Sequence, residues 1–137
     1  GDRLLLGADR VKDPAVLLAA YNDAQGVTAE FNRNLLHVLN RQLGADFVIE
    51  AFRHEAVYRE DRERIEMYLV STRPQTVRLR ALGECIGLAE GERILTEISC
   101  KFTPDSLESL LGAARMRVDA HYAPPDGYFS LVLARPG

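Results

Sequence analysis

The spacing of apolar and polar residues predicts one strand and two helices in the first third of the chain. Residues 3–8 form a short apolar run that ends in a turn, which is typical of a fully buried strand in a parallel sheet. Asp13 and Pro14 predict a helix start, because Asp can cap free N–H groups and Pro fits the first helical position. A second helix is predicted from about Thr28 to Gly44, since glycine commonly ends helices. Its apolar stripe follows helical spacing and comprises Phe31, Leu35, Leu36, Leu39 and Leu43.

Beyond the second helix, apolar residues recur at every second position. This alternation predicts antiparallel strands rich in Val, Ile, Tyr and Thr over residues 52–58, 64–71 and 75–82. The charged run 59–64 between the first two strands is interpreted as a solvated hairpin tip. Residues 93–102 are expected to be extended. The middle of the chain is therefore predicted to be a block of strands.

The last part of the chain is predicted to be a helix followed by a hairpin. Thr103 and Pro104 start the helix by the same capping logic, and its expected buried positions are Leu107, Leu110 and Leu111. Residues 116–122 and 128–134 are predicted strands, joined by a turn over 123–127 that is rich in Pro and Gly. The complete order predicts a mixed α/β chain with an insertion between the second and last helices.

Composition and charge favour a globular, cytoplasmic protein. The 137 residues are 47% apolar and 27% charged, which suits one domain, or one domain plus a piece of another. The net charge is −3, and no basic face stands out in the sequence. Nucleic-acid binding is therefore not expected. No apolar run approaches the roughly 18 residues of a membrane span. Cys85 and Cys100 cannot form a disulfide framework; they are expected to be small buried hydrophobes in a reducing compartment.

The histidines and glycines do not form a familiar catalytic or metal-binding motif. His37, His54 and His121 are far apart and lack metal-ligand spacing, and His37 is expected at the protein surface, so no metal site is predicted. No two of the ten glycines are separated by one residue. A nucleotide-like cofactor site of the doubly wound type normally needs such a loop after its first strand. Gly83, Gly87 and Gly91 are interpreted as residues of loops between strands.

Two segments carry polar residues that a purely structural role explains poorly. Alternation places Glu97, Ser99 and Lys101 on one face of a predicted strand. That face is either an exposed edge or a buried surface, and a buried Glu97 needs a hydrogen-bond donor. An imidazole N–H would satisfy it, with Ser99 completing the hydrogen bonds. Similarly, Tyr21 at the end of the first helix is either a core residue or a hydroxyl for a ligand.

Several motifs, in the same order from end to end of the chain, carry a resemblance to a known family. They lie at residues 4–9, 11–13, 20–23, 26–28, 31–34, 65–67, 96–102 and 127–131. In these motifs the chain resembles the S-adenosylmethionine-dependent L-histidine Nα-methyltransferases of ergothioneine biosynthesis. The resemblance covers only the C-terminal part of those enzymes, somewhat under half of their length.

The resemblance implies an α/β fold: the C-terminal part of a Rossmann-like class I methyltransferase with an inserted mixed α+β substrate-binding domain. Residues 1–10 would be a late Rossmann strand, and residues 11–101 the inserted domain. Residues 102–137 would be the last Rossmann helix and antiparallel hairpin. The first strand would then find its parallel neighbours on sequence outside this chain. Unpaired strand edges lead us to expect self-association of the fragment.

The resemblance also implies a function, namely transfer of methyl groups from S-adenosylmethionine to the α-amine of L-histidine, giving hercynine. By motif position, Tyr21 would bind the substrate carboxylate, Glu97 and Ser99 would hold the imidazole ring, and Met67 would shape the pocket. Glu97 is a specificity group here, not a catalytic base. The cofactor would be bound mainly by the missing N-terminal half, so the chain alone is expected to be inactive. The alternative is a stand-alone small-ligand binding or interaction module without catalytic activity.

Overall fold

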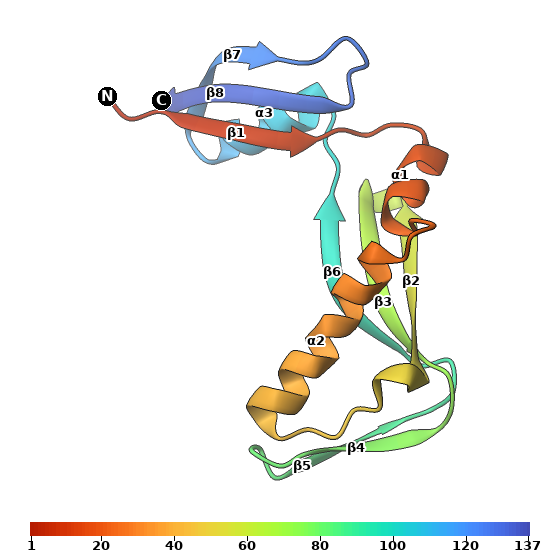
Figure 1. Cartoon of the computed structure of the whole chain (residues 1–137). Coiled ribbons are helices and arrows are strands. Elements are labelled where there is room, and N and C mark those ends of the chain that lie inside the picture. The colour runs from red at the N-terminus through yellow and green to blue at the C-terminus, as the bar shows by residue number, and fades with distance from the viewer.

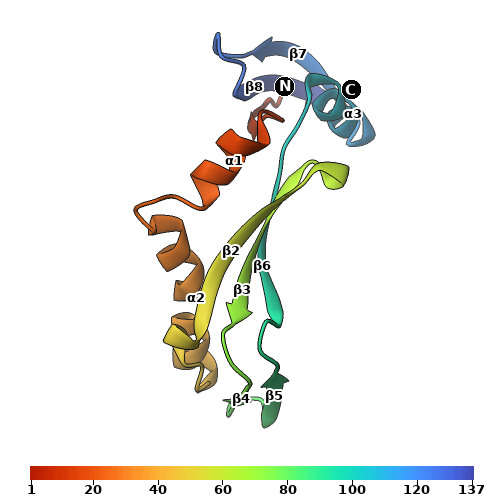
Figure 2. The same cartoon turned by 90° about the vertical axis from the view of Figure 1, so that its right-hand side faces the viewer.

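The computed structural model describes residues 1–137, which form two regions joined by a narrow neck (Figure 1, Figure 2). We call residues 1–10 and 102–137 the terminal region, because they contain both chain ends. Residues 11–101 form the central region. The fold is mixed α/β, with eight strands and three α-helices. None of the helices is both long and apolar enough to cross a membrane.

The terminal region is a three-stranded sheet with one helix on it. Strands β1 (Leu4–Asp9), β8 (Phe129–Pro136) and β7 (Met116–Tyr122) lie in the order β1-β8-β7, and both pairs are antiparallel. Helix α3 (Pro104–Ala113) begins at a capping box, in which Thr103 and Ser106 satisfy each other's backbone N–H groups. The small core between helix and sheet comprises Ala8, Leu107, Leu111, Val132 and Ala134.

Two predictions for the terminal region are wrong. The first strand is not fully buried, because β1 is an edge strand whose partner, β8, is antiparallel. Consequently Leu5 keeps 62% of its surface exposed. Leu110 was predicted to be buried but is 50% exposed. Leu107 and Leu111, one helical turn apart, contact the sheet, and Leu110 lies outside that row.

The two helices of the central region begin close to where the sequence predicted, and the second also ends there. The Asp13 carboxylate accepts a hydrogen bond of 2.8 Å from the Ala15 N–H at the start of α1 (Pro14–Tyr21). Helix α2 (Val27–Leu43) ends at Gly44, which has a left-handed backbone with φ of +57°. Such a conformation is easy for glycine and costly for residues with a Cβ.

A second antiparallel sheet forms the body of the central region, and both helices cover one of its faces (Figure 2). Its strand order is β2-β3-β6, with β2 (Phe52–Arg59), β3 (Arg64–Ser71) and β6 (Arg93–Cys100). Short 3-10 turns, Ile49–Ala51 and Glu60–Arg62, precede and follow β2. The second of these is the exposed hairpin tip that the charged run predicted.

A separate hairpin closes the end of the central region that lies farthest from the terminal region (Figure 1). It consists of β4 (Gln75–Leu79) and β5 (Glu84–Leu88). The predicted strand 75–82 therefore ends early, and β5 was not predicted because its residues show no alternation of burial. Gly87 belongs to β5 and not to a loop. Cys85 and Cys100 are both exposed, so the prediction that they are buried is wrong.

The central region has two hydrophobic clusters between its sheet and its helices. The larger one comprises Leu36, Phe47, Ala51, Phe52, Leu69, Val77, Leu79 and Leu88, and the smaller one Leu17, Ala56, Ile65 and Met67. The predicted stripe of α2 is only partly buried, since Phe31 is 65% and Leu35 38% exposed. Asn32 is buried beside them at 3% exposure. This part of α2 therefore meets the sheet through Asn32, while the side chains of Phe31 and Leu35 stay partly exposed.

Two adjacent segments make up the neck, residues 9–12 and 101–103. Arg10 and Phe102 form an isolated parallel bridge. The Phe102 N–H donates to the Asp9 carbonyl at 2.9 Å, and the Val11 N–H donates to the Phe102 carbonyl at 3.1 Å. The chain thus leaves and re-enters the terminal region through neighbouring, hydrogen-bonded strands.

Candidate functional site

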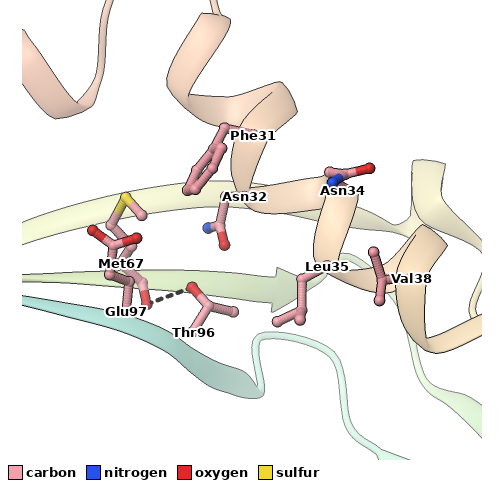
Figure 3. Close-up of a pocket in the computed structure, with 8 residues that line it drawn as sticks. All are labelled: Phe31, Asn32, Asn34, Leu35, Val38, Met67, Thr96 and Glu97. Carbon is pink, nitrogen blue, oxygen red and sulfur yellow. Dashed lines mark hydrogen bonds between the residues drawn. The ribbon is translucent and has the colours of Figure 1, made fainter.

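Two adjoining hollows lie between α2 and the strands β3 and β6. One, of about 310 Å³, is lined by Ala20, Tyr21, Val27, Thr28, Phe31, Met67 and Glu97. The other, of about 250 Å³, is lined by Phe31, Asn32, Asn34, Leu35, Val38, Met67, Thr96 and Glu97 (Figure 3). Because the hollows share Phe31, Met67 and Glu97, they form one continuous depression, which we call the trough. Its size suits a small-molecule ligand.

The trough brings together the four residues that the sequence singled out. Tyr21, Met67 and Glu97 line it, and Ser99 adjoins it because the Tyr21 hydroxyl donates to Ser99 Oγ at 2.8 Å. Met67 and Glu97 are cross-strand partners in β3 and β6. Met67 is buried in the smaller hydrophobic cluster, which fixes the floor of the trough. Phe31 projects from α2 on the opposite side (Figure 3).

A buried ammonium group stands behind the hydroxyl end of the trough. Lys101 Nζ donates to Tyr21 Oη and to Ser99 Oγ, each at 2.8 Å, and forms an ion pair of 2.9 Å with Asp9. The Lys101 side chain has no exposed surface. The face that carries Glu97, Ser99 and Lys101 is therefore turned toward the helices and is not an exposed edge.

The Lys101–Asp9 pair is charged on both sides. Burial lowers the pKa of the Lys101 amine, but hydrogen bonds with Tyr21 and Asp9 outweigh that effect and raise the pKa above its ordinary value. Burial likewise raises the pKa of the Asp9 carboxyl, and hydrogen bonds from Lys12 and Lys101 reverse the shift to a net lowering. The trough therefore has hydroxyls backed by a cation at one end and the Glu97 carboxylate where its two hollows meet, which suits a polar, zwitterionic ligand.

Comparison with known proteins identifies the family. A model of the family described as "Histidine-specific methyltransferase, SAM-dependent" matches residues 1–136. The chain belongs to this family. The resemblance drawn from the sequence motifs is confirmed.

The similarity to curated members of the family extends over almost the whole chain. The chain is 50% identical over 134 residues to the histidine N-alpha-methyltransferase of Mycolicibacterium smegmatis, and 48% identical to that of Mycobacterium tuberculosis. Each match covers 98% of this chain but 42% of the relative. The ergothioneine biosynthesis protein 1 of Neurospora crassa is 31% identical over 137 residues, which are 15% of its length. The chain thus spans less than half the length of these relatives.

No cofactor or metal contact can be assigned to the residues of this methyltransferase segment. Glycines with a left-handed backbone lie at the ends of α2 and in hairpin turns. No two glycines are separated by one residue, so the segment has no glycine-rich cradle for a nucleotide-like group. No group of three or more His, Cys, Asp and Glu side chains is placed to hold a metal ion.

Two residues that support the trough were missed by sequence reasoning. His54 Nδ1 lies 2.9 Å from the Asn32 amide nitrogen, and His54 Nε2 lies 2.9 Å from the Tyr21 carbonyl. An amide nitrogen only donates, so Nδ1 accepts and Nε2 carries the proton that is donated to Tyr21. Asn32 also donates to the Tyr68 carbonyl at 3.1 Å. The only signal in the sequence was a polar Asn within the apolar stripe of a helix.

Proposed function

We propose that the chain is the C-terminal part of an S-adenosylmethionine-dependent histidine Nα-methyltransferase of ergothioneine biosynthesis. In this proposal the chain supplies the pocket for the histidine side chain. The observation that carries the proposal is the convergence of Tyr21, Met67, Glu97 and Ser99 at one trough, in a chain that belongs to a histidine-specific family. The relatives that carry this name are more than twice as long as the chain, so the activity is proposed here for the whole protein.

The trough offers each part of histidine a complementary group. Glu97 accepts the imidazole N–H, and the Ser99 hydroxyl completes the hydrogen bonds to the ring. Tyr21 lies at the end of the trough proposed for the substrate carboxylate, and Met67 packs near the ring. A site built to hydrogen-bond a polar group can reject a ligand that lacks it by about 10⁴-fold, because buried partners remain unpaired. Glu97 therefore acts in specificity and not as a base.

The contribution of these residues to the reaction is alignment. S-adenosylmethionine, when bound, supplies an electrophilic methyl group. Methyl transfer to a neutral amine is an in-line displacement, so fixing the direction of the acceptor amine provides much of the acceleration. This chain's residues hold the carboxylate and the imidazole, the two ends of the substrate that flank the amine. The segment thus orients the acceptor, and we propose that the cofactor is bound by the rest of the protein.

We also propose a domain arrangement for the whole enzyme. The terminal region would be the last part of a Rossmann-like sheet, and the central region a substrate-binding domain inserted into it. The order β1-β8-β7 supports this proposal, because it leaves one side of β1 free to pair with further strands. The exposed Leu5 indicates a surface that such neighbours would cover. A cytoplasmic location would suit the two exposed, unpaired thiols.

Assay of the full-length protein tests the proposal. The protein is incubated with S-adenosylmethionine and L-histidine, or with other amino acids, and the products are analysed by mass spectrometry. We expect up to three methyl groups on the α-amine of histidine and none on amino acids without a ring N–H. Binding of histidine to the full-length protein without any methylation would instead favour the alternative, a ligand-binding module without catalysis.

A further inference from the structure

Lys101 is the residue behind the trough that the proposed function leaves without a role. It is the fully buried cation of the site, and it contacts Tyr21 and Ser99 but does not line the trough. We infer that Lys101 is a positioning residue, which makes the Tyr21–Ser99 hydroxyl pair an obligatory hydrogen-bond donor toward the ligand. The inference rests on the proposed function, because it specifies how that site recognises its substrate.

The role of Lys101 follows from the numbers of hydrogen-bond donors and acceptors on Lys101, Tyr21 and Ser99. An ammonium group has three N–H donors and no acceptor, and all three are used, on Asp9, Tyr21 and Ser99. Both hydroxyl oxygens must therefore accept from Lys101. The 2.8 Å bond between the two hydroxyls uses one of their two protons. One O–H remains, and the oxygen that carries it has already accepted two hydrogen bonds.

The hydroxyl pair can therefore offer a ligand a donor, whichever of the two hydroxyls donates to the other. A carboxylate oxygen or an unprotonated ring nitrogen fits this group, whereas an N–H does not. Where the two hollows meet, the Glu97 carboxylate can only accept. The trough can then recognise a ligand acceptor at its hydroxyl end and a ligand donor at Glu97. A neutral imidazole or an amino-acid carboxylate can be recognised only in one orientation.

The neck fixes where Lys101 lies. Asp9, the last residue of β1, holds the Lys101 ammonium and is itself held by Lys12 at 2.5 Å. The Phe102 N–H, next to Lys101 in the chain, donates to the backbone carbonyl of the same Asp9. Lys101 is thus anchored from the terminal region while it contacts two hydroxyls of the central region. Loss of the ammonium should free both hydroxyls to rotate and to accept hydrogen bonds.

Lys12 provides a matched control for a substitution at Lys101. Both lysines pair with the Asp9 carboxylate, but Lys12 has no hydrogen bond to Tyr21 or Ser99. In the full-length protein we expect Lys101→Met to raise the KM for histidine about tenfold or more, with kcat within about threefold, because a lost positioning contact weakens ground and transition states alike. Lys12→Met should leave both constants within about twofold of the parent.

A double-substitution background separates positioning from a general structural effect. In a Tyr21→Phe/Ser99→Ala protein the hydroxyls are absent, so adding Lys101→Met should change the KM by less than about twofold. Circular dichroism and thermal melting confirm folding of each variant. If Lys101→Met does not fold, Lys101→Gln replaces it; an amide can accept a hydroxyl proton, so the KM should still rise.

Each outcome is decisive. The inference is overturned if a folded Lys101 variant keeps the parent's KM, if Lys12→Met raises the KM equally, or if Lys101→Met has its full effect in the background without hydroxyls. In all three cases the parent still methylates histidine, and the proposed function stands. If the parent does not methylate histidine, the proposed function is wrong and the inference is overturned with it.

Discussion

The strands of the two regions differ sharply in burial. In the central region β3 buries six of its eight residues, because it has a neighbouring strand on both sides and helices over one face. In the terminal region β1 buries one residue of six. It pairs on one side only, and the helix of that region covers a core of five residues.

This difference in burial shows which region is packed firmly enough to shape a ligand site. The trough is built on β3 and β6 of the central region and on the helices α1 and α2 that cover them. The three-stranded terminal sheet exposes several large apolar side chains, namely Leu4, Leu5, Val118 and Phe129. We expect the central region to set the precision of substrate binding, and the terminal region to require a covering partner.

The largest effect should come from truncating a side chain in the core of the central region. Leu69 in β3 has no exposed surface, and its replacement by Ala should lower the free energy of unfolding by about 2–5 kcal/mol. The same truncation at the exposed Leu5 should change it by no more than about 0.5 kcal/mol. Urea unfolding of the 137-residue chain measures both. Equal losses would contradict the comparison between the regions.

The second prediction concerns the carboxylates on the two faces of the central sheet. Glu97→Ala removes the group proposed to accept the imidazole N–H, so kcat/KM for histidine should fall roughly ten- to a hundredfold in the full-length protein. Glu66 is the control, because it belongs to the opposite face and is held by Arg64 and Tyr68. Glu66→Ala should leave the kinetics within about twofold. Unchanged kinetics for Glu97→Ala would disprove the pocket assignment.

The third prediction tests whether the terminal sheet needs a partner. The isolated chain should self-associate through its exposed apolar face, since burying one leucine contributes about 1.5–3 kcal/mol. Leu5→Glu should then weaken association about tenfold, as measured by analytical ultracentrifugation. Val16→Glu, an exposed change on α1, serves as the control and should not affect association. A monodisperse parent chain at high concentration would contradict the expectation.

The smallest effect is a pH dependence located at the neck between the regions. The folded-state pKa of Asp9 lies below its ordinary value of 3.8, so its carboxylate stabilises the fold above that pH. This contribution is lost as the pH falls through the folded-state value. The parent's advantage in unfolding free energy over Asp9→Asn should therefore shrink between about pH 6 and about pH 3. Urea unfolding of both proteins checks this, and a difference independent of pH would show that the Asp9 charge is not involved.

Features set by neighbouring residues could be predicted from the sequence. Asp13-Pro14, Thr103-Pro104 and Gly44 mark helix ends, because caps act on adjacent backbone groups. Features that depend on distant partners could not be predicted. Leu110 is exposed because of where the terminal sheet lies, and the apolar run at residues 3–8 does not say which strand will pair with it.

The candidate site likewise has local features that the sequence predicted and long-range features that it did not. Alternation placed Glu97, Ser99 and Lys101 on one face correctly, because strand periodicity is local. Contact between Tyr21 and Ser99 joins residues 78 positions apart, and nothing in the spacing indicates it. Their grouping followed from the resemblance to a family. His54 was missed, because its two partners, Asn32 and Tyr21, lie on two separate helices.

The paired strands of the neck also matter for how such proteins can be altered. Arg10 and Phe102 are bridge partners, so the whole central region begins and ends at a single point on the terminal region. A segment whose two ends are adjacent can be deleted, and the residues on either side of it can be joined by a short turn. It can also be exchanged for a segment of different length without changing the strand order of the host sheet. We therefore expect that residues 11–101, with the proposed substrate pocket, can be exchanged as one segment while the terminal region is kept.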